Sequence, residues 1–204
     1  MPFSLAVVAL VAAFTWVVQP LAGRVWVPPF AAGVLALGVW HAVRAGDWGW
    51  STRALLPGLA ASAVFTAAMA VALFVASEAS GTRPDRPILL LDALAPGAAW
   101  IVLWGGAQQW LLQTTFLREA ESARTRRPAI VAAALFGALH LPNPFLTTVT
   151  AVSAVGWCAI YRRYPNVLPL ALSHAAGTLV VEALFDASVT GRLRVGYSYL
   201  QLGP

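Results

Sequence analysis

The sequence predicts an all-α protein, a polytopic integral membrane helix bundle with about seven membrane segments. Three observations predict this fold class. Apolar residues make up 59% of the 204 residues and charged residues only 10%, whereas about a quarter of the residues in a soluble domain are charged. The apolar residues gather in runs long enough to cross a bilayer, at about 20 residues per crossing. Most of the arginines fall in the short connections between these runs, and two follow the last run.

The apolar runs define the expected segments in chain order. The first is expected to remain as an anchor, because residues 1–13 lack the basic start of a cleaved signal peptide. The fourth is too long for one straight crossing, and the pair Pro96-Gly97 is expected to break it. The fifth is marginal as a complete span. The expected segments are 3–21, 25–43, 54–76, 88–117, 128–141, 145–161 and 167–185.

This pattern divides the chain into three parts. N-terminal membrane helices are expected over 1–87, a core that carries the polar site over 88–186, and a C-terminal tail over 187–204. The single cysteine, Cys158, excludes an internal disulfide framework and any zinc-type cysteine spacing. The arginines are scattered through short loops and do not form one basic face, which argues against nucleic acid as a partner and in favour of the lipid bilayer.

The arginines also predict an orientation, because cytoplasmic loops of membrane proteins carry the excess of positive charge. With the N-terminus inside, eight arginines fall in cytoplasmic connections and five on the other side. We therefore expect the N-terminus to face the cytoplasm, in a bacterial cytoplasmic membrane. The cytoplasmic set is Arg44, Arg53, Arg118, Arg124, Arg126, Arg127, Arg162 and Arg163, and the outer set is Arg24, Arg83, Arg86, Arg192 and Arg194.

A few polar residues lie at membrane depth, where each is costly and suggests a functional site. Helical spacing sorts them into faces, because residues four positions apart lie on one side of a helix. Two histidines in separate short segments are the most informative, since imidazole serves as a metal ligand and as a proton carrier. The set consists of Gln108, Gln109 and Gln113, of His140 with Asn143 beyond it, and of His174, Thr178 and Glu182. The alternative is that these groups form hydrogen bonds between helices and only hold the bundle together.

Three stretches in this set resemble the CPBP intramembrane protease family, which includes the type II CAAX prenyl proteases and the Abi bacteriocin-immunity proteins. The family carries Glu-Glu-x-x-x-Arg, then Phe-x-x-x-His, then His-x-x-x-Asn, and the matching stretches here are "QQWLLQ", "FGALH" and "HAAGT". Phe136, His140 and His174 match the family pattern, as does the loop "HLPN" that contains Asn143.

Four positions depart from the family pattern. Gln108 and Gln109 replace both glutamates, Gln113 replaces the arginine, and Thr178 replaces the asparagine. Glutamine is nearly isosteric with glutamate and avoids the cost of an ion in lipid. Once the carboxylates are absent, the arginine has no counter-charge. The loss of both signs of charge together indicates natural divergence.

The resemblance implies roles for these residues. A glutamate of the first motif activates a water molecule in the family, while the histidines and the asparagine orient that water and stabilise the oxyanion, or hold a metal. Glutamine is neutral and cannot accept the proton. We therefore expect Gln108, Gln109, His140 and His174 at the catalytic positions, with Gln113, Phe136, Asn143 and Thr178 supporting the site or binding substrate.

Two histidines with amide oxygens make a poor zinc site, because zinc in proteins takes three or four protein ligands. No metal is assigned, no cofactor is expected, and a weakly held divalent metal remains open.

Two function classes follow. The first is an intramembrane endopeptidase homologue that acts on a membrane-associated peptide or protein, with catalysis reduced or altered by the loss of the glutamates and with His140 or His174 as the base. The second is a pseudoprotease that binds a membrane peptide without cutting it, in an immunity or accessory role. A transporter is a third and weaker reading, because no pair of segments shows inverted repetition.

Overall fold

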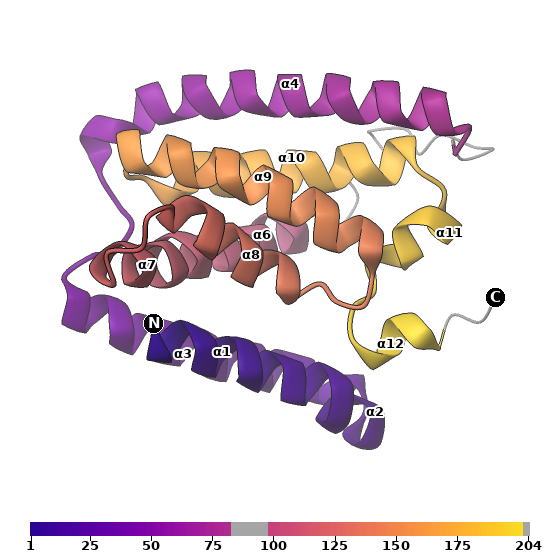
Figure 1. Cartoon of the computed structure of the whole chain (residues 1–204), viewed down its shortest axis with the longest axis horizontal. Coiled ribbons are helices and arrows are strands. Elements are labelled where there is room, and N and C mark those ends of the chain that lie inside the picture. Colours follow the sequence, from indigo (N-terminus) through magenta and orange to yellow (C-terminus); the bar gives the residue numbers. More distant parts are fainter. Residues whose placement is uncertain (83–97, 202–204) are drawn as a thin grey trace. The chain divides into compact units, whose positions relative to one another are not determined.

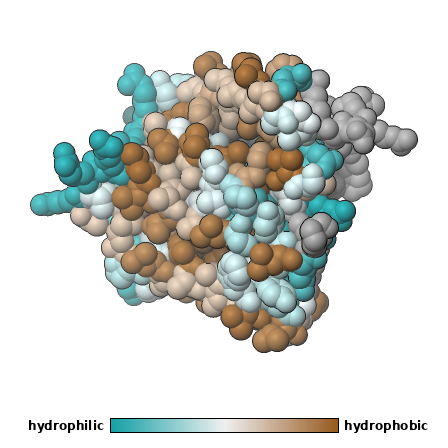
Figure 2. Space-filling view, turned by 45° about the vertical axis from the view of Figure 1, so that its right-hand side comes forward, coloured by the Kyte–Doolittle hydropathy of each residue, from teal (hydrophilic) through white to brown (hydrophobic). Residues whose placement is uncertain are grey.

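The computed structural model describes residues 1–82 and 98–201, and it is helical without any strand over these residues. Within the described residues, five helices are long and apolar enough to cross a membrane. Hydrophobic side chains cover much of the surface visible in Figure 2. These observations confirm an all-α membrane helix bundle, and the chain is an integral membrane protein.

The five long helices lie where the sequence predicts them. The predicted total of about seven segments is not confirmed, because the fourth falls partly outside the described residues and the fifth is short. The expected break at Pro96-Gly97 also lies outside the described residues. The five helices cover Pro2–Ala22, Val27–Ala45, Thr52–Ser80, Pro144–Arg163 and Val167–Leu184.

The described helical elements follow one another in chain order, with residues 83–97 outside the description. Two of them, η1 and η4, are π-helical, and η2, η3 and η5 are 3₁₀ turns. The described elements are α1 (Pro2–Ala13), η1 (Phe14–Val18), α2 (Gln19–Ala22), η2 (Arg24–Trp26), α3 (Val27–Ala45), η3 (Thr52–Ala54), α4 (Leu55–Ser80), α6 (Ala98–Leu111), η4 (Leu112–Leu117), α7 (Arg118–Ser122), α8 (Pro128–Ala138), α9 (Pro144–Arg163), α10 (Val167–Leu184), α11 (Ala187–Thr190), η5 (Gly191–Leu193) and α12 (Tyr197–Leu200).

The fifth predicted segment forms only the 11-residue helix α8, which ends at Ala138. The four-residue spacing predicted that Phe136 and His140 share one face of a helix. In the structure, His140 lies in the turn after the helix. Pro142 explains the early end, because a proline has no N–H to donate and its ring clashes with the carbonyl four residues earlier.

The chain forms two compact units. Unit 1 contains Met1–Trp48, Leu111–Cys158 and Leu193–Pro204, and unit 2 contains Gly49–Trp110 and Ala159–Arg192. The division into parts at residues 87 and 186 stays a prediction.

Unit 2 is built on α4 and α10, which lie side by side and run in the same direction (Figure 1). At one end, Val167 donates its N–H to the carbonyl of Gly49. Midway, the hydroxyls of Thr66 and Ser173 are 2.7 Å apart. At the other end, Asp186 donates its N–H to the carbonyl of Thr82. The contacts rise together in residue number along both helices, so the pair is parallel.

Unit 1 is centred on the π-helix η4. All six residues of η4 are buried, and the element contacts α1, α3, α7 and α8. The start of α1 is held by Glu119 of α7, whose carboxylate accepts the N–H of Phe3 at 3.0 Å and that of Ser4 at 2.6 Å. An acidic group in this position satisfies the free N–H groups at a helix start and interacts favourably with the helix dipole.

Candidate functional site

The candidate site residues divide between the two units. In unit 2 they lie where α6 approaches α10. A Cβ placed on Gly105 would be 3.5 Å from Cγ of His174, and one on Gly106 would be 3.5 Å from Cβ of Ala171. Small residues allow two helix backbones to come close together in a membrane. The two glycines therefore bring α6 against the part of α10 that carries His174.

Gln109 follows Gly105 by one helical turn and is on the same face of α6. Its side chain is fully buried, and its Nε2 lies 3.3 Å from Nδ1 of His174. With the amide N–H as donor, Nδ1 of His174 accepts and the proton of the ring is on Nε2. The buried imidazole of His174 is thus oriented by a neutral amide and not by a carboxylate.

The other predicted residues of unit 2 are placed differently. Gln108 is half-buried, and no hydrogen bond to its side chain is found among the described residues. Thr178 donates its hydroxyl to the carbonyl of His174 at 3.1 Å, so this hydroxyl is used within α10. Glu182 lies half-buried two turns after His174.

In unit 1, the turn after α8 carries His140. Its Nδ1 is 2.9 Å from the carbonyl oxygen of Phe136 and 3.2 Å from the hydroxyl of Thr150 on α9. The ring of Phe136 meets that of His140 edge-on, with the ring centres 5.2 Å apart. Residues of two helices, Phe136 of α8 and Thr150 of α9, therefore contact the imidazole of His140.

Asn143 stabilises the loop that follows His140. Its Oδ1 accepts the N–H of Leu146 at 3.0 Å, which caps the start of α9 next to a proline at the first helical position. Its Nδ2 donates to the carbonyl of Arg194 at 3.0 Å. The side chain thus ties the C-terminal segment to this loop, and the backbone N–H of Gly196 adds a bond to the carbonyl of Leu141 at 2.8 Å.

Gln113 lies in unit 1, within η4, and its side chain is fully buried. A π-helical turn widens the backbone and often occurs at functional positions. Gln113 therefore lies in an unusual backbone segment at the centre of its unit.

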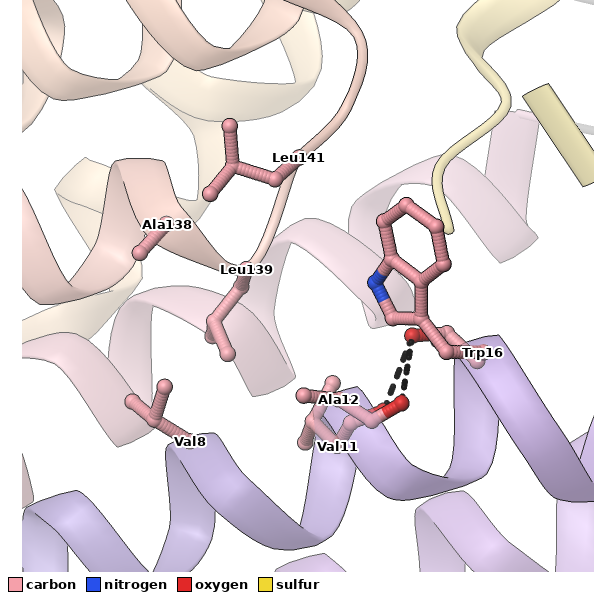
Figure 3. Close-up of a pocket in the computed structure, with 8 residues that line it drawn as sticks. Val8, Val11, Ala12, Trp16, Ala138, Leu139 and Leu141 are labelled. Carbon is pink, nitrogen blue, oxygen red and sulfur yellow. Dashed lines mark hydrogen bonds between the residues drawn. The ribbon is translucent and has the colours of Figure 1, made fainter. Parts of the chain in front are cut away.

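A small cavity lies beside the His140 turn. Figure 3 shows Leu139 and Leu141, the neighbours of His140, together with Ala138. They lie opposite Val8, Val11 and Ala12 of α1 and Trp16 of η1. Its volume is about 10 Å³, which is the space of about one water molecule. This cavity is too small for a peptide substrate.

Residues of the types that ligate metals do not form a cluster in the described part of the chain. No group of three or more His, Cys, Asp or Glu side chains lies close enough there to hold a metal ion. Among the described residues, the donor set therefore does not match a three-ligand zinc site.

Sequence reasoning missed two residues that support the site. Thr150 contacts His140 from another helix, and Gly105 sets the approach of α6 to His174. Threonine and glycine are common in membrane helices, so neither stands out by residue type. The one available signal for Gly105 was its spacing of four residues from Gln109.

The comparison with known families covers this region of the chain. Residues 94–180 match the family described as type II CAAX prenyl endopeptidase Rce1-like. Over this segment the chain is similar to the Rce1-like family. The match confirms the resemblance to the CPBP and CAAX proteases, and it contains every site residue predicted from the sequence, from Gln108 to Thr178. Neither the curated proteins nor the solved structures gave a match to the chain.

Proposed function

We propose that the chain is a CAAX-protease-like intramembrane endopeptidase homologue with reduced catalysis, which acts on a membrane-associated peptide or protein. The observation that carries this proposal is the contact between Gln109 and His174. A neutral amide contacts the histidine, at the motif position where the resemblance implies a carboxylate. This contact supports a motif whose glutamine side chains carry no charge.

The chemistry of the side chains explains the reduced rate. A glutamate can accept a proton from water, and a general base of this kind contributes about 10²–10⁴-fold to the rate of an enzyme. Gln108 and Gln109 can hydrogen-bond a water molecule without taking its proton. In the proposed mechanism, His140 takes the role of the base. The second motif histidine, His174, is held by Gln109 with its ring proton on Nε2.

A second candidate is a pseudoprotease that binds a membrane peptide without cutting it. The replacement of every charged residue of the first motif by glutamine favours this candidate, since the shape of the motif is kept without its charge. Both candidates predict peptide binding, and they differ in cleavage.

The test uses the full chain in liposomes and a quenched fluorescent peptide that ends in a prenylated CAAX sequence. The variant carries Gln108→Glu, Gln109→Glu, Gln113→Arg and Thr178→Asn. The arginine is included because an unpaired carboxylate at this depth is costly. We expect the variant to cleave about 10²–10⁴-fold faster than the wild type, in proportion to a regained general base. Gln201→Glu, which adds a carboxylate at an exposed position, is the control and should not change the rate.

The outcomes separate the two candidates. Slow wild-type cleavage that is abolished by His140→Ala and by His174→Ala supports the reduced enzyme. Binding of the peptide without any wild-type cleavage supports the pseudoprotease. Robust wild-type cleavage that survives both histidine substitutions would contradict both.

A further inference from the structure

The two contacts of His140 determine which of its ring nitrogens carries the proton. The carbonyl oxygen of Phe136 has lone pairs and no hydrogen, so at 2.9 Å it can only accept from Nδ1. The Nδ1 atom of His140 is therefore protonated in the neutral ring, and its Nε2 holds the lone pair.

Thr150 fits the same proton assignment. Its hydroxyl donates to the carbonyl of Leu146 at 2.6 Å, one turn earlier on α9. With its hydrogen used there, the oxygen of Thr150 offers a lone pair to His140 Nδ1 at 3.2 Å. The N–H of His140 is thus shared between two acceptors, one at the end of α8 and one on α9.

Two acceptors also restrain the orientation of the ring. A single acceptor leaves an imidazole free to rock about one hydrogen bond, whereas a second acceptor on another helix restricts that motion. The side chain of Thr150 is buried, so water competes little for the contact. Neighbouring groups that hold a histidine in this way fix both the tautomer and the direction of the other nitrogen.

We propose that Thr150 is a positioning residue for His140, which keeps Nδ1 protonated and presents Nε2 as the basic atom. This inference rests on the proposed function, in which His140 is the base. Thr150 itself touches neither water nor substrate in this scheme and acts through the imidazole.

The test reads the tautomer directly. The full chain is labelled with ¹⁵N-histidine in lipid bilayers, and the His140 signals are assigned by their loss in His140→Gln. We expect the wild type to show protonated Nδ1 and unprotonated Nε2. Thr150→Val, which keeps the shape and removes the hydroxyl, should introduce the Nε2-protonated form and slow peptide cleavage about two- to tenfold, as expected for the loss of one hydrogen bond.

Two further variants control the experiment. Thr150→Ser keeps the hydroxyl and should restore both the wild-type tautomer and the wild-type rate. Thr148→Val removes an exposed hydroxyl on the same helix that donates to the carbonyl of Pro144, and it should change neither the tautomer nor the rate.

A wild-type spectrum with protonated Nε2 would overturn the inference, and so would a Thr150→Val protein with an unchanged tautomer. The tautomer is measured without substrate, so it separates this inference from the proposed function. A protein with the expected tautomers that neither binds nor cleaves the peptide would contradict the proposed function and leave the role of Thr150 in orienting His140 in place.

Discussion

Glu119 joins two segments that are more than 100 residues apart in the sequence. Burial by itself would raise the pKa of this carboxyl, but the hydrogen bonds from the Ser4 hydroxyl and from the backbone N–H groups of Ser4 and Phe3 outweigh it. The nearby N-terminal ammonium acts in the same direction, at 3.5 Å. The net pKa of Glu119 is below its ordinary value of 4.5. The ionised form is therefore the one that stabilises the fold.

The sign of this shift predicts a pH dependence. A carboxyl whose pKa is lowered by folding contributes its full stabilisation above its unfolded-state pKa, and the contribution is lost as the pH falls through the folded-state pKa. Thermal unfolding measured from pH 7 down to pH 3 should show stability falling at pH values below 4.5. Glu119→Gln should lower the free energy of unfolding at pH 7 by about 1–2 kcal/mol and flatten the fall in acid.

Glu121 offers a matched control on the same helix. Glu121 forms an ion pair with Arg118 at 3.3 Å, and the side chain of Arg118 is exposed. Exposed ion pairs contribute about 0–1 kcal/mol. An effect of Glu121→Gln as large as that of Glu119→Gln would contradict the role given to the cap of α1.

Individual residues were only partly predictable from the sequence. Gln109 and His174 could be selected because polar side chains are costly in lipid. Their contact with each other could not be derived, since it depends on the approach of α6 to α10 at Gly105. The sequence did not single out Thr150, because a threonine hydroxyl in a helix can donate to a backbone carbonyl one turn earlier, as Thr150 does to Leu146.

At the level of elements, the contact between α6 and α10 depends on a small residue at position 105. An added Cβ would lie 3.5 Å from His174 and 3.6 Å from the carbonyl oxygen of Ala171, which is ordinary van der Waals contact. A methyl group therefore fits, whereas a branched side chain has to push the helices apart.

Gly105→Ala should consequently be tolerated, and Gly105→Leu should destabilise the protein by about 1–3 kcal/mol through overpacking. The measurement is thermal unfolding in detergent, together with the ¹⁵N signals of His174, which should change when the contact with Gln109 is lost. Gly33→Leu on α3 is the control, because an added Cβ there meets nothing within 4 Å. Equal effects of the two leucine substitutions would show that Gly105 has no special packing role.

The long helices were the most predictable elements, because an apolar run of about 20 residues can satisfy its backbone in lipid only as a helix. The end of α8 was less predictable. Hydrophobicity continues to Leu141, and only Pro142 indicates that the backbone cannot continue as a helix.

For the whole molecule, the parallel pair α4 and α10 constrains the topology. Two parallel membrane helices start on the same side of the bilayer, so the chain between Ser80 and Val167 must return across it an odd number of times. The predicted orientation meets this condition, with three segments between them. The connections before α4 and before α10 are then cytoplasmic, and the segment after α10 is on the outer side.

Cysteine accessibility tests this topology. Cysteines at Ser51 and Ser122 should react with a membrane-impermeant reagent only from the cytoplasmic side, and one at Ser188 only from the outer side. The background should be low, because the native Cys158 is buried. Labelling of Ser122→Cys from the outer side would reverse the orientation, and labelling of Ser51→Cys and Ser188→Cys from one side would contradict the parallel crossing of α4 and α10.

The parallel pair also has a consequence for how the protein enters the membrane during synthesis. The ribosome completes α4 long before α10 is made, so α4 must first exist in lipid without its partner. Its hydroxyls suit this order, because Thr66 donates to the carbonyl of Ser62 at 2.7 Å and Ser77 to that of Phe74 at 2.9 Å, both within the helix. When α10 arrives, Ser173 can donate to the oxygen of Thr66 without breaking either bond. We therefore expect α4 to insert into the bilayer on its own. Its packing against α10 then follows as a separate assembly step.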